Sequence, residues 1–334
     1  MKRRIIAAVM ALTLACSALA GCGKSDTSSS AAGSSAAGGD TYPTKPVTII
    51  CPWGVGGGAD VIARKVAQIG EEYLGQPIIV ENHTGASGTL GMADALAADA
   101  DGYTMFTTTG PLFSLTPQYV PVEYELSDAT LLKGMRSGSL VMLTNPDKSG
   151  VESFDDLKAL GAERKIKYGT SGGPGSDQYV LATAAFKMAG IDAEAVVFES
   201  ASEAINAIVS GQVDMSITTP PQYYDYEESG DIKTIATFDS TALETPFGMV
   251  PSLKELGVDV EFTGMDCFAI RADVPEEALT ALRNMLDKVY ADEEFISFMN
   301  EMGYPINDDD TAELEAFVTD QMEQMNRYVE TISE

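Results

Sequence analysis

Short apolar runs alternate with amphipathic segments along most of the chain beyond residue 44. Runs rich in β-branched residues predict strands at VTIIC, PIIVEN, YTMFTT, SLVMLT, KIKYG, AVVF, DMSIT, IKTIAT and CFAI. Helical periodicity fills most of the intervals, and capping boxes support two helix starts, Ser153 with Asp156 and Ser200 with Glu203. This alternation predicts an α/β protein, and the stretch is longer than one core usually holds, so we expect two domains.

The last part of the chain, from Pro275 to Ile332, has a helical pattern and no strand pattern. We expect it to return and cover the first domain, which requires two crossovers between the domains. We place these near Thr144–Gly150 and Gly264–Ile270, with SLVMLT and CFAI side by side as a hinge. The predicted first lobe is then 44–145 plus 266–334, and the second lobe is 146–265.

The first residues predict export. Lys2, Arg3 and Arg4 precede an apolar run that ends in LAGC at Cys22, and this sequence is similar to the bacterial lipobox. That similarity implies that residues 1–21 are a cleaved signal peptide and that Cys22 is lipidated, with 22–43 as anchor and flexible tether. A transmembrane helix is the alternative, but the run is shorter than the roughly twenty residues that spanning needs.

Charge and composition then narrow the chemistry. The formal net charge is −29, and removal of the signal takes away three positive charges, giving −29 − 3 = −32. Such acidity argues against nucleic acid as a partner. The single histidine, His83, excludes a metal site of several imidazoles, and no cofactor is expected. Whether Cys51 and Cys267 pair cannot be read from the sequence, although both have flanks typical of buried strands.

Two glycine-rich loops are the candidate ligand-binding segments. Pro52–Asp60, PWGVGGGAD, lies between a predicted strand and a helix start, and Thr170–Ser176, TSGGPGS, repeats that arrangement in the other predicted lobe. Glycines expose backbone N–H groups, and a helix N-terminus adds unpaired donors and a positive dipole end. Each loop alone is typical of an ordinary turn. Together they predict one anion site between the lobes.

The first of these loops lies in a longer signature. The run from Tyr42 to Thr104 resembles the amino-terminal signature of the tripartite tricarboxylate transporter substrate-binding proteins, the Bug family. The resemblance continues through SGGPGS, through SGQVD at 210–214 and through VPSLKELG at 250–257. The matching positions of the first run are Pro46, Pro52, Gly57, Asp60, Arg64, Gly75, Glu81, Asn82, Gly85, Gly88 and Asp101–Tyr103.

The resemblance implies a fold, a function and partners. The fold would be a two-lobed flytrap of the type II periplasmic-binding kind with two crossover strands. It would be a monomer that captures a small carboxylate, catalyses no reaction and delivers the ligand to a large and a small integral membrane permease subunit. It would work outside the cytoplasm, lipid-anchored to the outer face of the cell membrane.

The same resemblance implies that backbone amides of the two loops grip the ligand carboxylate. The residues carried over are Gly56, Gly57, Gly58, Ser171, Gly172, Gly175 and Ser176. Strand-end geometry adds three further candidates, Thr109, Thr218 and Thr219.

Two residues beside the first loop have alternative roles. We expect Asp60 to be the N-cap of the following helix, paired with Arg64 one turn later, although direct ligand contact is the alternative. Trp53, the only tryptophan, forms either a wall of the site or part of the core at the strand end.

The chain also departs from the family pattern. Many members have a histidine after the second loop, where this chain has Asp177–Tyr179, and a Tyr-Lys-Gly run where it has Phe198–Ser200. An acid in place of a cation disfavours a multiply charged anion. We therefore expect a ligand with fewer negative charges or with an amine.

Three other functions are weighed against a receptor. Gly54, Gly56 and Ala59, with Glu81 downstream, imitate a dinucleotide-binding motif, but Pro52 and Trp53 separate the strand from the glycines. The segment 169–173 imitates the nucleophile elbow of an ester hydrolase, but no histidine follows it. An adhesive lipoprotein would need no paired glycine loops. We therefore predict a receptor and no enzyme.

Overall fold

The predicted alternation of strands and helices forms two five-stranded sheets in one compact unit. The structure is a computed structural model that describes residues 42–333, apart from 137–138, 221, 305, 307–308 and 310. The predicted signal peptide, Cys22 and all but the last two residues of the tether lie outside the described residues.

The first sheet has the strand order β2–β1–β3–β12–β4 and mixes parallel with antiparallel neighbours. β1 runs parallel to β2 and β3, whereas β12 runs antiparallel to β3 and β4. Since β12 comes late in the chain, this sheet is complete only after the chain has passed through the second sheet. The strands are β1 (Val47–Cys51), β2 (Ile78–Asn82), β3 (Thr104–Thr109), β4 (Ala129–Arg136) and β12 (Met265–Arg271).

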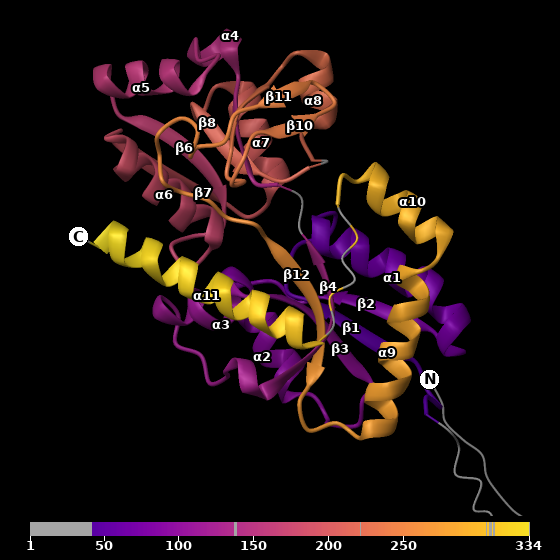
Figure 1. The fold of residues 1–334 in the computed structure, drawn as a ribbon. Coiled ribbons are helices and arrows are strands. Elements are labelled where there is room, and N and C mark those ends of the chain that lie inside the picture. Colours follow the sequence, from indigo (N-terminus) through magenta and orange to yellow (C-terminus); the bar gives the residue numbers. More distant parts are fainter. Residues whose placement is uncertain are drawn as a thin grey trace, which may run out of the picture. The chain divides into compact units, whose positions relative to one another are not determined.

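Helices cover both faces of the first sheet (Figure 1). Val47 and Ile49 pack with α1 (Gly58–Leu74), α9 (Glu276–Tyr290) and α10 (Glu293–Glu301). Ile50 and Phe106 face the other way and pack with α2 (Thr89–Ala97), α3 (Pro111–Ser114) and the start of α11 (Thr311–Ser333). Three single-turn 3-10 helices complete this region: η1 (Ala86–Gly88), η2 (Thr116–Gln118) and η3 (Leu126–Asp128).

The two core cysteines are buried and unpaired. Successive side chains of a strand point to opposite faces of the sheet. Cys51 shares the face of Ile49, whereas Cys267 shares the face of Ala269, which packs with Phe106 on the other side. The sheet itself therefore separates the two thiols.

The second sheet has the order β7–β6–β8–β5–β9. β6 runs parallel to β7 and β8, and β5 runs antiparallel to β8 and β9. Its strands are β5 (Val141–Thr144), β6 (Ile166–Ser171), β7 (Ala193–Phe198), β8 (Met215–Thr218) and β9 (Lys233–Thr237). Its further elements are α4 (Pro146–Ser149), α5 (Phe154–Glu163), α6 (Asp177–Ala189), α7 (Ala201–Ser210), α8 (Tyr224–Ser229) and the hairpin of β10 (Leu243–Thr245) and β11 (Gly248–Val250).

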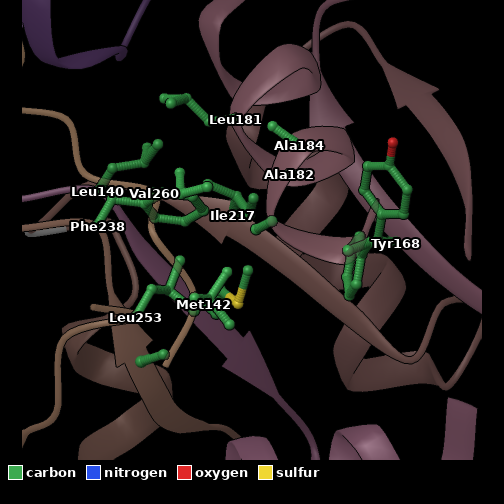
Figure 2. Packing of buried hydrophobic residues seen from close by; sticks show 14 of the residues in the cluster. Leu140, Met142, Tyr168, Leu181, Ala182, Ala184, Ile217, Phe238, Leu253 and Val260 are labelled. Carbon is green, nitrogen blue, oxygen red and sulfur yellow. The ribbon is translucent and has the colours of Figure 1, made fainter. Parts of the chain in front are cut away.

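Apolar side chains from the sheet and from α6 fill the core of this region (Figure 2). Met142 and Ile217 of the central strands pack in one cluster with Leu181 of α6. Phe238 and Val260, which follow the sheet strands, extend the cluster. The helix that follows the second glycine loop is therefore fixed by its apolar face.

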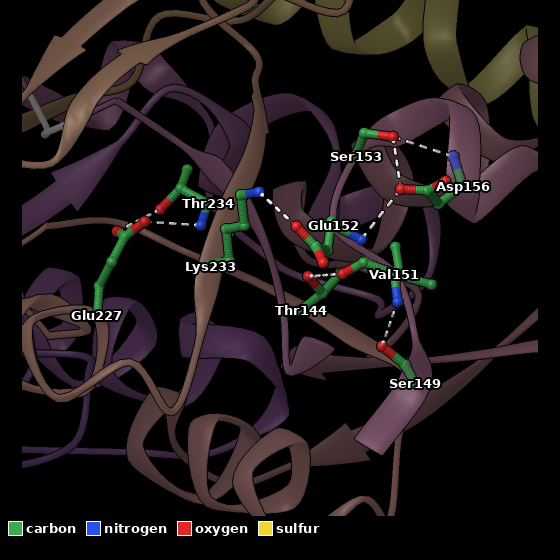
Figure 3. A network of polar contacts seen from close by, with 9 residues as sticks. All are labelled: Thr144, Ser149, Val151, Glu152, Ser153, Asp156, Glu227, Lys233 and Thr234. Carbon is green, nitrogen blue, oxygen red and sulfur yellow. Dashed lines mark hydrogen bonds and ion pairs between the residues drawn. The ribbon is translucent and has the colours of Figure 1, made fainter. Parts of the chain in front are cut away.

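Ser153 and Ser200 are the N-caps of α5 and α7, as predicted, and in each pair the acid accepts a hydrogen bond from the amide of the residue before the serine. Ser153 Oγ accepts a hydrogen bond from Asp156 N, and Asp156 Oδ2 accepts one from Glu152 N, as Figure 3 shows. Ser200 Oγ likewise accepts from Glu203 N at 3.3 Å.

The predicted hinge pairing is wrong. β5, which contains most of SLVMLT, pairs with β8 and β9, and β12, which contains CFAI, pairs with β3 and β4. The chain therefore changes sheets between Arg136 and Val141, and again shortly before Met265. β4 was missed because Lys133 and Gly134 interrupt its apolar pattern; Lys133 is buried there and pairs with Asp287 at 3.1 Å.

The C-terminal segment is helical as predicted, but it does not cover the first sheet alone. α9 packs against α1, whereas α11 contacts α3 and β4 on one side and α6 on the other. Leu314 belongs to the first sheet's core, and Met325 and Tyr328 belong to the second's. Tyr328 Oη also donates a hydrogen bond to Glu261 O at 2.8 Å. α11 therefore joins the two sheets.

Candidate functional site

The first glycine loop leads from β1 into an uncapped helix. Gly57 is the N-cap of α1 and offers no side chain, and Gly56 has φ +82°, which favours glycine. Among the described residues, the amides of Gly58, Ala59 and Asp60 have no hydrogen-bond partner. The first turn of a 17-residue helix therefore presents three donors at the positive end of its dipole.

Asp60 holds this loop, but it is not the predicted N-cap. It lies three residues after Gly57, and its carboxylate reaches back: Oδ2 accepts from Gly56 N at 2.8 Å and from Arg64 Nε at 3.1 Å. Oδ1 accepts from Asn82 Nδ2 at 2.8 Å. Burial raises the pKa of Asp60, which is 1 % exposed, but the bonds from Arg64, Gly56 and Asn82 outweigh this and leave the pKa below its usual value.

The predicted pair of Asp60 with Arg64 is confirmed, at 2.9 Å between Oδ1 and the guanidinium. Arg64 also donates to Asn82 Oδ1 at 2.8 Å, and Asn82 donates to Trp53 O at 2.9 Å. Among the described residues, Arg64 is thus the only cationic side chain that contacts this loop, and it is bound to Asp60 and Asn82. We call this group of Asp60, Arg64 and Asn82 the clasp, and its bond to Gly56 N fixes the backbone there.

Trp53 packs toward the core. Its ring lies with the cluster of Ile50 and Leu112, and a side chain at Gly88 would place its Cβ 3.1 Å from the ring. The residue is only partly buried. The ring therefore closes the side of the first loop against α2 and keeps some exposure to solvent.

The second glycine loop differs, because side chains of the loop and of α6 accept hydrogen bonds from some of its donors and from the first turn of α6. Ser176 is the N-cap of α6, and its Oγ accepts from Tyr179 N at 3.3 Å. Ser171 N and Ser171 Oγ both donate to Gln178 Oε1 at 3.0 Å. Gly172, at φ +116°, donates to Phe198 O at 3.3 Å. Among the described residues, the amides of Gly173, Gly175 and Asp177 have no partner.

Asp177 adds a negative charge to this loop. Its Oδ1 accepts from Gln178 N at 2.7 Å, so a carboxylate of the chain itself occupies the first turn of α6. Surrounding protein desolvates this carboxylate and raises its pKa, although part of the residue reaches solvent. The Asp177 carboxylate is therefore only partly shielded from solvent.

The two halves of the protein contact each other at two places, and each place lies beside one of the glycine loops. Thr116, just beyond β3 and α3, donates from Oγ1 to Gly175 O at 2.7 Å. At the second place, Tyr304 lies over the start of α1, where a Cβ at Gly58 would be 2.6 Å from its hydroxyl. The same hydroxyl interacts with Thr219 beyond β8, and burial raises its pKa.

The structure places the strand-end threonines at the predicted edges. Thr109 ends β3 and is partly exposed, and Thr219 contacts Tyr304. Thr218 is 1 % exposed, and its hydroxyl donates to Gln222 Oε1 at 2.8 Å, so it is turned away from open solvent. Sequence reasoning missed Tyr304, because it lies between two helices with no motif around it.

The residues of the alternative enzyme motifs are engaged elsewhere. His83 Nδ1 lies 2.8 Å from Asp94, and Nε2 lies 3.3 Å from Glu81, which holds this imidazole at the first sheet. The Ser171 hydroxyl is bonded to Gln178 instead of a base. Within the described part of the chain no group of three or more metal-ligating side chains occurs, and no helix is long and apolar enough to cross a membrane.

Comparison with known proteins assigns the chain to a family. Residues 62–333 match the model of the tripartite tricarboxylate transporter family receptor, TctC. Protein BugT of Bordetella pertussis is 31 % identical over 242 residues, which span 70 % of this chain and 72 % of BugT. The chain therefore belongs to the TctC receptor family. This confirms the predicted family and the prediction of a transport receptor that is not an enzyme.

Solved structures confirm the two-lobed α/β periplasmic-binding-protein fold. The structure of the periplasmic binding protein BugD has a TM-score of 0.79 at 22 % identity, covering 87 % of this chain and 99 % of BugD. The R. palustris protein Rpa4515, solved with adipate, has a TM-score of 0.80 at 21 % identity, covering 87 % and 98 %. MatC from Rhodopseudomonas palustris, solved with bound malate, has a TM-score of 0.77 at 19 % identity, covering 87 % and 100 %.

Proposed function

We propose that this member of the TctC receptor family is an extracytoplasmic lipoprotein that captures a small carboxylate between its two lobes. It then delivers the ligand to the large and small membrane permease subunits of a tripartite tricarboxylate-type transporter. The family supports a transport role, and the relatives solved with adipate and malate support a carboxylate as ligand. We take the first lobe to hold the sheet with β12 and the second lobe to hold the sheet with β5, which the two separate five-stranded sheets support.

The uncapped N-terminus of α1 is the observation that carries the proposal. A glycine N-cap leaves the first-turn amides of Gly58, Ala59 and Asp60 open, and the clasp of Asp60 and Arg64 holds the preceding loop. A carboxylate at this place gains hydrogen bonds and the helix dipole together. Gly56 and Gly57 let the ligand approach the backbone.

Capture follows from the two places where the lobes touch. Thr116 contacts Gly175, and Tyr304 joins the start of α1 to Thr219, so each contact lies beside a glycine loop. A ligand that touches both sides binds the closed arrangement more tightly than the open one and shifts the population toward it. The permease then receives the closed form.

The N-terminal sequence supports the location. A signal peptide over 1–21, lipidation at Cys22 and a tether to residue 43 would hold the receptor at the outer face of the cell membrane. A tether of this length lets the receptor reach a permease in the same membrane.

The test places a carboxylate on the receptor itself. Gly57 has extended backbone angles, φ −71° and ψ 162°, which aspartate adopts and which suit an N-cap. Gly57→Asp supplies a side-chain carboxylate to the amides of α1, with Gly57→Asn as the uncharged control of the same size. The Cβ would lie 3.2 Å from Gly54 O, so the loop must yield slightly in both variants.

We expect unchanged or higher thermal stability in Gly57→Asp and loss of ligand binding in calorimetry against a panel of small carboxylates. Gly57→Asn should retain more binding than Gly57→Asp, because it lacks the competing charge. Equal affinity of Gly57→Asp and the unmodified receptor for the same carboxylate would falsify the proposed site.

A further inference from the structure

The two helix N-termini beside the glycine loops have opposite character. Both have open amides nearby, but α1 has a glycine cap and no side-chain acceptor on its first-turn amides. In α6, Ser176 Oγ accepts from Tyr179 N and Asp177 Oδ1 accepts from Gln178 N. A second carboxylate of a ligand would have to compete with Asp177 for α6. The site is therefore asymmetric, with an anion receptor on one lobe and an anion on the other.

No basic residue in the surrounding segments offsets Asp177. Lysine, arginine and histidine are absent from 52–60, 109–119, 170–179, 198–203 and 218–224, which follow the carboxyl ends of β1, β3, β6, β7 and β8. Arg64, just beyond the first of these segments, is bound by Asp60 and Asn82. Two like charges in a partly desolvated site repel each other without such an offset.

The Asp177 carboxylate still has capacity for a partner. Its Oδ1 accepts from Gln178 N, and Oδ2 has no hydrogen-bond partner among the described residues. Surrounding protein partly desolvates the carboxylate, and a desolvated carboxylate gains from a nearby cation. An ammonium group brings both the charge and up to three donors.

We propose that Asp177 selects ligands that carry an ammonium group, so that the receptor takes an amino-substituted carboxylic acid with its carboxylate at the N-terminus of α1 and its ammonium at Asp177. This inference rests on the proposed function and names the ligand class of the same site. It separates this chain from a receptor of dicarboxylates, since a second carboxylate would meet Asp177 where the ammonium is placed.

Pairs of ligands that differ only in the charged group farthest from the bound carboxylate test which charge the Asp177 side of the site prefers. β-Alanine and succinate differ by an ammonium in place of one carboxylate, and 4-aminobutyrate and glutarate form the same pair with one more methylene; the L-α-amino acids and propionate complete the panel. Calorimetry with the full receptor should find an amino-substituted acid that binds at least about tenfold more tightly than its dicarboxylate counterpart.

The variant Asp177→Asn keeps an oxygen that can accept from Gln178 N, so the cap of α6 survives while the charge is lost. Asp177→Asn should bind the amino-substituted acid at least about tenfold more weakly than the unmodified receptor does. The difference in affinity between the amino-substituted acid and its dicarboxylate counterpart should therefore become smaller. Asp155→Asn is the matched control, because Asp155 is an exposed acid in the first turn of α5. The control should bind like the unmodified receptor, and thermal unfolding without ligand checks the fold of both variants.

A dicarboxylate that binds most tightly, with an affinity unchanged in Asp177→Asn, would overturn the inference while leaving a carboxylate receptor in place. Binding of no acid in the panel would contradict the proposed function itself.

Discussion

Removal of the Asp60 carboxylate should destabilise the protein by more than the loss of a simple helix cap. Asp60 is 1 % exposed and accepts hydrogen bonds from Gly56, Arg64 and Asn82, so Asp60→Ala removes a charge-assisted network from the loop and from the first turn of α1. A lost N-cap costs about 1 kcal/mol. The structure requires a larger value.

The size of this loss of stability depends on whether water or another residue replaces each hydrogen bond that Asp60 made. Hydrogen bonds to a charged group contribute about 1.5–3 kcal/mol, and the favourable charge near the helix N-terminus adds about 0.3–1 kcal/mol. Arg64 has a side chain that is 47 % exposed, so water can replace part of its loss, and Asn82 keeps its bond to Trp53 O. We therefore expect Asp60→Ala to lower the free energy of unfolding by roughly 2–3 kcal/mol.

Urea denaturation monitored by circular dichroism measures this free energy. Asp94→Ala is the control, because Asp94 also has one basic partner, His83, but its side chain is 60 % exposed and should contribute less than about 1 kcal/mol. Ligand affinity should fall with Asp60→Ala as well, since the loop before α1 loses its clasp. A cost below about 0.5 kcal/mol for Asp60→Ala would refute the reasoning.

Four further predictions concern Asp60 again and three other parts of the chain. The pKa of Asp60 is lowered in the folded protein, so its ionised carboxylate stabilises the fold above the unfolded pKa of about 3.9, and this stabilisation is lost as the pH falls through the folded pKa. The difference in unfolding free energy between the unmodified protein and Asp60→Asn should therefore shrink below pH 4. A difference that grows below pH 4 contradicts this prediction. Tyr304→Phe should weaken ligand binding by about three- to tenfold through loss of one hydroxyl at α1, measured by calorimetry; unchanged affinity would count against this placement. Cys51, whose pKa burial raises to about 11, and Cys267, whose pKa burial also raises, should react with an alkylating reagent only in denaturant, and a reductant should leave the melting temperature unchanged. Cys22→Ser should release the protein from the membrane fraction and abolish incorporation of labelled fatty acid.

The pattern of apolar residues was sufficient to predict most of the fold, because buried parallel strands appear in a sequence as short apolar runs. It failed at β4, where Lys133 lies buried beside Asp287 of a helix that comes much later in the chain. It also failed at the crossovers, since a strand's own sequence does not say which neighbour it pairs with. The separation of Cys51 from Cys267 likewise depends on strand order and face, which only the assembled sheet defines.

The candidate site was predictable as two loops but not as an asymmetric pair. Glycine spacing indicated exposed backbone donors in both loops, and the sequence placed Asp177 beside the second. Only the hydrogen bonds reveal that the side chains of Ser176 and Asp177 accept from two amides of the first turn of α6, whereas no side chain accepts from the first-turn amides of α1. Tyr304 reaches α1 from a segment between α10 and α11, a long-range contact that no local pattern encodes.

A crystal structure of the receptor with a ligand identified from the calorimetric panel tests the central claim most directly. The account predicts that the ligand carboxylate accepts hydrogen bonds from the backbone amides of Gly58, Ala59 and Asp60, with the rest of the ligand directed toward the second glycine loop. A ligand carboxylate held by side-chain cations away from α1, with these amides unoccupied, would contradict it.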